Sequence, residues 1–186
     1  MADFDALLRH NRDFARTDAR NRVPAIPFLP HQQLYVVTCI DPRVDPHPLL
    51  GLELGDAIVA RTVGGRVTPA VLQDLAWITH LHREKTPDAG WFDLAVVHHT
   101  DCGAGLFADD ELRRGFASRH SYDEAALRDL AVVDPGETVR TDVDRVRRSA
   151  SIDLRVRVSG WSYDVATGLL TEVVRPAASP DPAAIG

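Results

Sequence analysis

The chain has 186 residues, which is enough for one domain with a sizeable core and too few for two ordinary domains. Its content of 45% apolar and 26% charged residues is typical of a globular protein, and its formal charge of −6 argues against partners such as nucleic acid or an anionic membrane. The acidic N-terminus does not resemble a signal peptide and no apolar run approaches the roughly 18 residues of a membrane span, so we expect a single cytoplasmic domain over residues 1–186.

The first 33 residues are predicted to form an N-terminal helix and an extended arm. Apolar residues from Phe4 to Phe14 stand among charged ones, a pattern that indicates an amphipathic helix within residues 3–20. Three prolines then favour extended chain: Pro24, Pro27 and Pro30.

Strand-like segments follow along the rest of the chain. A continuous run rich in β-branched residues predicts a strand buried on both faces over residues 34–40. Further strands are predicted over residues 57–60 and 92–99. An alternating segment over residues 154–164, a turn ending at Gly168 and the segment 169–174 predict a hairpin.

Helices are predicted between these strands. Thr68 is a suitable N-cap and Pro69 suits the first helical position, so a helix begins there. The pattern Ser121-x-x-Glu124 is typical of a capping box that opens a second helix, and three valines form the apolar stripe of a third: Val139, Val143 and Val146. Because strands alternate with helices, we expect an α/β fold with a central, mostly parallel β-sheet flanked by helices.

Chemically capable side chains gather where the predicted strands end. Cys39 and Asp41 follow the first strand, Arg61 follows the second, and His99 and Cys102 follow the third. Ligands of open parallel sheets bind at the carboxyl ends of the strands, so these side chains mark the candidate site.

The residue types indicate a zinc site. Cys39 and the pair His99-x-x-Cys102 supply three ligands and leave one tetrahedral position open, which is the arrangement of a catalytic zinc rather than a structural one. Zinc-bound water supplies hydroxide near neutral pH. Asp41 and Arg43 could form an ion pair that orients this hydroxide. Alternatively, Asp41 takes the fourth position itself and closes the site.

Simpler interpretations compete with this one. Either cysteine alone could be a packing residue, although the use of both cysteines at strand ends favours metal binding. Gly64-Gly65 lacks the spacing and lysine of a phosphate loop and is typical of a tight turn. Other polar residues are expected on the surface, in loops or in turns rather than on the metal: His47, His80, His82, His98, His120, Asp45 and Asp101.

These residues resemble the β-class carbonic anhydrases, in particular their short bacterial branch. Five motifs carry the resemblance from about Leu34 onward: Cys39-Ile40-Asp41-Pro42-Arg43, Leu52-Glu53-Leu54-Gly55-Asp56-Ala57, Arg61-Thr62-Val63-Gly64-Gly65, His98-His99-Thr100-Asp101-Cys102-Gly103 and Tyr163-Asp164-Val165-Ala166-Thr167-Gly168. The two metal motifs are specific in combination, and the glycine segment is supporting evidence.

The resemblance implies one Zn²⁺ per chain, held by Cys39, His99 and Cys102, with Asp41 and Arg43 as the catalytic pair. It implies reversible hydration of carbon dioxide to bicarbonate and a proton by zinc-bound hydroxide.

The resemblance also implies a substrate site and an assembly. Gly103 and Gly64 are expected to contact substrate. The N-terminal helix is expected to pack on the partner chain of a homodimer, and whether dimers pair further is left open.

Three rival functions are kept. Thr62-Val63 stands where the family more often has Asn-Ala, so the same zinc site could hydrolyse carbonyl sulfide or carbon disulfide. A zinc-bound protein without turnover would keep Asp41 on the metal at all pH values. A metal-free thiol enzyme would use Cys102, His99 and Asp101.

Overall fold

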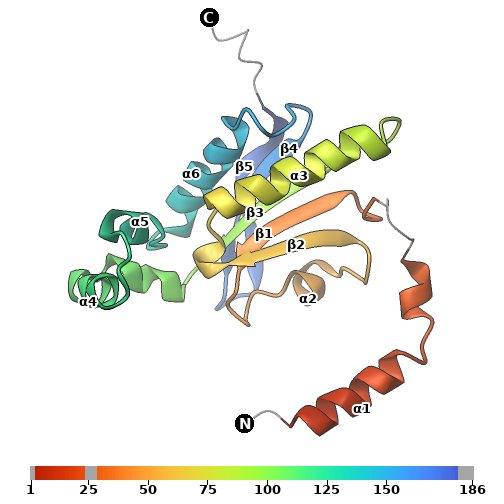
Figure 1. Ribbon diagram of the computed structural model, residues 1–186, viewed down its shortest axis with the longest axis horizontal. Helices are drawn as coiled ribbons and strands as arrows, with labels where there is room; N and C mark the ends of the chain where they lie inside the picture. The colour runs from red at the N-terminus through yellow and green to blue at the C-terminus, as the bar shows by residue number, and fades with distance from the viewer. Residues whose placement is uncertain (1–2, 24–28, 180–186) are drawn as a thin grey trace, which may run out of the picture.

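The computed structural model describes residues 3–23 and 29–179, and of Arg22 it describes the backbone alone. A five-stranded sheet has the order β2-β1-β3-β4-β5. Its strands are β1 (Leu34–Cys39), β2 (Ala57–Thr62), β3 (Asp93–His99), β4 (Arg157–Asp164) and β5 (Leu169–Ala178). The first four are parallel and β5 pairs antiparallel with β4, as the predicted hairpin requires. The expected α/β class is confirmed (Figure 1).

Helices cover both faces of the sheet and its carboxyl end. The longer ones are α1 (Phe4–Phe14), α3 (Pro69–Lys85), α4 (Asp110–His120) and α6 (Pro135–Arg147). The shorter ones are α2 (Pro46–Leu50) and α5 (Glu124–Asp129), with the 3₁₀ turns η1 (Ala19–Arg22), η2 (Val63–Gly65) and η3 (Gly103–Ala108). Helices α3 and α6 lie on one face and α2 on the other (Figure 1).

Alternation along the strands divides the core between the two faces. Tyr35 and Val37 of β1 belong to the larger cluster, which packs beneath α3 and α6. Val36 and Val97 belong to the smaller cluster on the side of α2. Because both faces are covered, β1 and β3 are almost fully buried, which explains their continuous apolar sequence.

One predicted helix start is confirmed and another is wrong. Thr68 accepts a hydrogen bond from the Val71 N–H and begins α3. Ser121 is not a capping-box residue, because its φ of 58° places it at the left-handed C-cap of α4. Asp123 caps α5 instead and accepts from the Ala125 and Ala126 amides.

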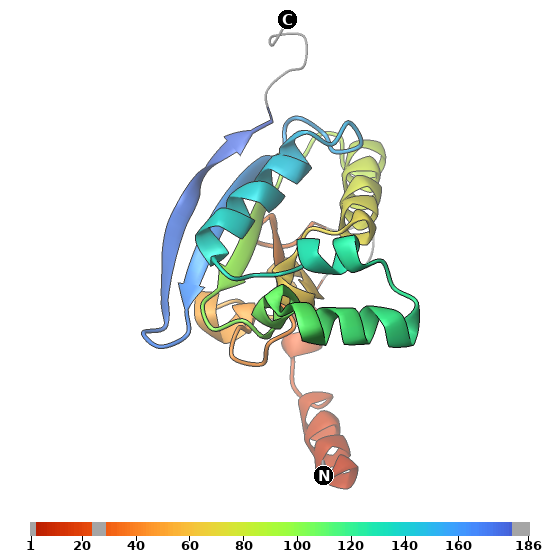
Figure 2. The same ribbon diagram turned by 90° about the vertical axis from the view of Figure 1, so that its left-hand side faces the viewer.

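Helix α1 projects away from the body of the molecule (Figure 2). None of its residues is buried, and its apolar side chains are exposed in this chain: Phe4, Leu7, Leu8 and Phe14. The predicted helix over residues 3–20 is thus a shorter helix followed by η1, and Pro24 and Pro27 lie outside the described residues. Within the described ranges, the helices are too short or too polar to cross a membrane.

Candidate metal centre

The structure brings three predicted metal ligands together at the carboxyl end of the sheet. Cys39 ends β1, His99 ends β3, and Cys102 follows β3 in the turn before η3. The parallel pairing of β1 and β3 places the two strand ends side by side. The ligand atoms of Cys39, His99 and Cys102 lie within 4.8 Å of one another, and they form the group suited to a metal ion within the described part of the chain.

The donor geometry fits zinc. The two sulfur atoms are 3.9 Å apart. Two thiolates at the usual Zn–S distance of about 2.3 Å on a tetrahedral ion would be separated by about 3.8 Å. His99 Nδ1 donates to the carbonyl of Thr100 at 2.8 Å, which fixes the tautomer and leaves Nε2 with a free lone pair. Nε2 is buried and has no hydrogen-bond partner among the described residues, so a metal ion would satisfy it.

The two cysteine thiols have very different pKa values. A hydrogen bond from the Cys102 thiol lowers the pKa of Cys39 to about 4, although burial opposes this shift. The same bond, together with burial, raises the pKa of Cys102 well above its usual value. Burial alone would lower the pKa of His99, but the neighbouring Cys39 sulfur and the hydrogen bond to the Thr100 backbone raise it. The thiol proton therefore stays on Cys102 in the absence of a metal ion. A cation that displaces this proton would be bound by two thiolates, so metal binding would release a proton.

Asp41 and Arg43 form the predicted ion pair beside these ligands. Arg43 donates from Nε to Asp41 Oδ1 at 3.0 Å and from Nη2 to Oδ2 at 2.7 Å. These hydrogen bonds from Arg43 lower the pKa of Asp41 to about 2, so Asp41 is ionised at neutral pH. Its Oδ2 lies 4.0 Å from His99 Nε2. The carboxylate therefore lies next to the candidate metal ligands, and Arg43 holds both of its oxygens.

Two further contacts hold the pair in place. Arg43 Nη1 donates to Asp101 Oδ2 at 2.7 Å, which links the loop after β1 to the loop after β3. Arg61 donates to the backbone carbonyls of Cys39 and Asp41 at 3.0 and 2.7 Å. The backbone of the first ligand motif is thereby fixed from two sides. Asp101 has the expected turn conformation, with a φ of 51°, but its carboxylate has a partner that the spacing did not indicate.

Of the two glycines expected to contact substrate, Gly64 lies in η2 and Gly103 begins η3. A side chain added at Gly103 would meet nothing within 4 Å, so the chain is open to solvent there. Gly64 has a φ of 71°, as a tight turn requires, and a side chain there would approach Ala104 and Val132 to 2.9 and 3.0 Å. The predicted turn at Gly64-Gly65 is confirmed.

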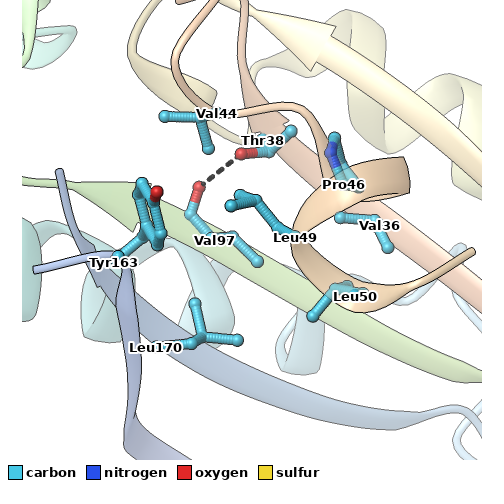
Figure 3. Close-up of a pocket in the computed structure, with 10 residues that line it drawn as sticks. Val36, Thr38, Val44, Pro46, Leu49, Leu50, Val97, Tyr163 and Leu170 are labelled. Atoms are coloured by element: carbon cyan, nitrogen blue, oxygen red, sulfur yellow. Dashed lines mark hydrogen bonds between the residues drawn. The ribbon is translucent and has the colours of Figure 1, made fainter.

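An apolar cavity of about 30 Å³ lies behind the first ligand motif, on the side of α2 (Figure 3). Its walls include Val36, Val44 and Leu49, and the Thr38 hydroxyl beside it donates to the carbonyl of Val97 at 3.1 Å. This volume is about that of one water molecule.

Two histidines lie where the sequence interpretation did not expect them. His98 is fully buried rather than at the surface, because it faces α6 while His99 faces the other way. His82 is also buried and packs edge-on against Trp91. Asp45 is the N-cap of α2, as expected of a cap residue.

The geometry does not favour the metal-free thiol enzyme. That hypothesis assigns to Asp101 the role of orienting the histidine, and Asp101 instead pairs with Arg43. The orienting acceptor of His99 is a backbone carbonyl, that of Thr100.

Comparisons with known proteins find similar sequences and similar structures. No family model matches the chain. The chain is 32% identical over 177 residues to "Beta-carbonic anhydrase 1" of Mycobacterium tuberculosis strain H37Rv, covering 93% of this chain and 99% of the relative. It is 29% identical to "Carbon disulfide hydrolase" of Acidianus sp. strain A1-3, covering 88% and 85%. The crystal structure of a carbonic anhydrase from Streptococcus mutans superposes with a TM-score of 0.71 at 32% identity, covering 93% and 98%.

Proposed function

The chain belongs to the β-carbonic anhydrase family, and we propose that it hydrates carbon dioxide reversibly to bicarbonate and a proton at a zinc ion held by Cys39, His99 and Cys102. The observation that carries this proposal is the buried, unpaired Nε2 of His99 beside two cysteine sulfurs 3.9 Å apart. A single Zn²⁺ ion would satisfy all three groups.

Zinc bound there would act as a Lewis acid that makes water a nucleophile near neutral pH. The chain's own residues position the reactants. Asp41 stays ionised because of Arg43, so its carboxylate can accept a hydrogen bond from the attacking water and orient it. Arg43 is itself held by Asp101, so Asp41 does not have to be reoriented in each turnover. Gly103 and Gly64 are proposed as the substrate contacts.

Two substitutions separate metal binding from the orienting role. We expect His99→Ala to lose stoichiometric zinc and activity, while His80→Ala, which changes an exposed histidine of α3, keeps both. We expect Asp41→Asn to keep zinc but lose most of the hydration rate, by about 10²-fold or more. Zinc is measured by elemental analysis and the rate by stopped flow. Normal zinc content in His99→Ala would remove it from the ligand set, and an unchanged rate in Asp41→Asn would remove Asp41 from the mechanism.

Carbon disulfide hydrolysis is the second candidate. The 29% identity to the Acidianus enzyme over 88% of this chain favours it. One zinc-loaded preparation, assayed with carbon dioxide and then with carbon disulfide, decides between them. Release of sulfide from carbon disulfide without hydration of carbon dioxide would replace the leading proposal.

A homodimer and a cytoplasmic location complete the proposal. The exposed apolar face of α1 supports packing against a second copy, because 71% of Phe4 and 55% of Leu7 are accessible in the single chain. Two thiolate ligands support a reducing compartment. Sedimentation should give twice the 20.5 kDa mass of the chain, and Leu7→Glu should shift it toward one copy. Sedimentation of the unaltered chain as a single copy would rule out the dimer.

A further inference from the structure

A cluster of buried polar side chains lies behind the metal centre, on the side of α6. His98 and Asp142 are 0% exposed and Arg66 is 2% exposed. The reaction proposed above uses none of them. Burying such groups is costly unless each has partners, so their contacts show what the cluster connects.

Asp142 on α6 is the centre of the cluster. Its carboxylate accepts from Arg66 Nε at 2.7 Å and Nη2 at 3.2 Å, from the Val67 amide at 3.0 Å, and from Arg145 Nη1 at 3.0 Å. Since Arg66 and Val67 directly follow η2, these bonds attach the Val63–Gly65 turn to α6.

His98 connects the same turn to the end of β3. Its Nε2 lies 3.2 Å from the carbonyl of Gly65 and 3.3 Å from Asp142 Oδ2. Both neighbours are acceptors, so Nε2 carries the hydrogen and donates to them. Its Nδ1 makes a 2.8 Å hydrogen bond with the Thr138 hydroxyl on α6. The ring is thus held at both nitrogens.

The turn that His98 holds touches a metal ligand. A Cβ added at Gly65 would lie 3.0 Å from the Cys39 amide nitrogen and 3.0 Å from the carbonyl of Val97. The turn therefore packs directly on the backbone at the ends of β1 and β3. His98 is also the neighbour of His99 in β3, so the contacts that hold the His98 side chain also restrain the backbone that carries His99.

We propose that His98, held by Thr138, is a positioning residue for the metal centre: it fixes the Gly65 turn and the end of β3, and so sets the placement of Cys39 and His99. The proposal rests on the assignment of these two residues as zinc ligands. It predicts that loosening the His98 ring weakens zinc binding without removing any ligand.

Two threonines of α6 give a matched test. Both hydroxyls lie within hydrogen-bond distance of the carbonyl oxygen four residues earlier. That of Thr138 is 2.9 Å from the Asp134 oxygen, which shares its single hydrogen with His98 Nδ1, and that of Thr141 is 3.1 Å from the Glu137 oxygen. The change Thr→Val therefore removes the same helix contact at both positions and keeps the β-branched shape. It removes a contact with His98 only at position 138. Thr138→Ser keeps the hydroxyl and is the conservative rescue.

The readouts are zinc affinity, the ligand field of the site and thermal stability. Zinc affinity is measured by competition with a chromophoric chelator, well below the unfolding temperature, and the ligand field by the visible spectrum of the cobalt(II) form. We expect Thr138→Val to raise the zinc Kd by about tenfold and to shift the cobalt bands, with Thr141→Val and Thr138→Ser close to the unaltered chain. Thermal unfolding of the two valine variants reports any common effect on the helix.

The outcomes separate this inference from the proposed function. Equal zinc Kd values and identical cobalt spectra for Thr138→Val and Thr141→Val would overturn the positioning role while leaving the zinc site intact. Failure of the unaltered chain to bind one zinc would overturn both proposals. A zinc Kd raised in Thr138→Val alone would support the positioning role even if the protein does not hydrate carbon dioxide.

Discussion

The packing of Gly65 against the first ligand motif allows a quantitative test by substitution with alanine. Gly65 has a φ of 69°, and a Cβ there would lie 3.0 Å from the Cys39 nitrogen and 3.1 Å from the Thr38 carbonyl carbon. These are backbone atoms that cannot rotate away. Gly51 has a similar φ of 65°, but a Cβ there would meet nothing within 4 Å.

The difference in stability loss between the two alanine variants isolates the cost of the close contact between the new Cβ and the backbone at Gly65. An alanine in the left-handed region costs about 1–2 kcal/mol, and this is the full cost expected for Gly51→Ala. Gly65→Ala should cost the same amount plus about 1–3 kcal/mol for forcing the turn off the two strands. The total expected loss at Gly65 is therefore about 2–5 kcal/mol.

Urea unfolding followed by circular dichroism measures the free energy of unfolding of both variants. Chelator is present and the chain concentration is fixed, so neither zinc binding nor assembly contributes to the difference. In a separate titration, zinc affinity should fall for Gly65→Ala and stay unchanged for Gly51→Ala. Equal losses of stability in the two variants, or unchanged zinc affinity in Gly65→Ala, would refute the reasoning.

Three further predictions concern a buried ion pair, a carboxylate with a lowered pKa, and the metal ion. Arg66→Met leaves Asp142 buried without its main partner and should lower the free energy of unfolding in urea by about 3–5 kcal/mol. Arg114→Met, which removes an exposed ion pair, should lower it by less than about 1 kcal/mol. Similar losses in the two variants would contradict the role given to the buried ion pair. Hydrogen bonds from Arg155 hold the pKa of Asp153 below its ordinary value. The stability that the ionised Asp153 contributes is therefore fully present above about pH 4, its pKa in the unfolded chain, and is lost as the pH falls through its lower pKa in the folded chain. Asp153→Asn should therefore be less stable than the unaltered chain at pH 7 and indistinguishable from it in strong acid, and a difference independent of pH would exclude this origin. Removal of zinc by a chelator should abolish hydration and re-addition should restore it, whereas full activity after chelation would exclude a zinc enzyme.

The strands and the grouping of Cys39, His99 and Cys102 at the strand ends were predictable because their signals are local. A strand buried on both faces must be apolar throughout, so β1 and β3 are visible as continuous runs. Parallel strands bring their carboxyl ends together, so the residues that follow each run indicate the site. The opposite directions of His98 and His99 follow from the same alternation.

Helix α4 was missed because its buried side has no apolar stripe. Its buried residues are Arg113 and Ala117. Arg113 is accommodated by Asp110 and Glu124 and by the carbonyl of Phe107, and contacts of this kind leave no periodic signal. The capping-box error has a related cause, since Ser121 is chemically suited to cap a helix, yet it ends one helix while Asp123 begins the next.

The buried cluster behind the metal centre could not be foreseen from sequence. Arginine and aspartate are found mostly at surfaces and histidine is intermediate, so the residue types do not indicate that Arg66, Asp142 and His98 are buried. Arg66 and Asp142 are 76 residues apart in the sequence, and they meet only because α6 packs against the sheet beside η2. The link between Arg43 and Asp101 spans 58 residues and is hidden for the same reason.

Carbon dioxide hydration by stopped flow tests the central claim most directly, on protein shown to hold one zinc per chain, from about pH 6.5 to about pH 9. Asp41, with a pKa of about 2, is ionised throughout this range, so its titration does not shape the profile. We expect a rate above the buffer background that rises with pH as water at the metal ionises. The absence of any rate above background at every pH, with zinc fully bound, would contradict the assignment of this chain as a working carbonic anhydrase.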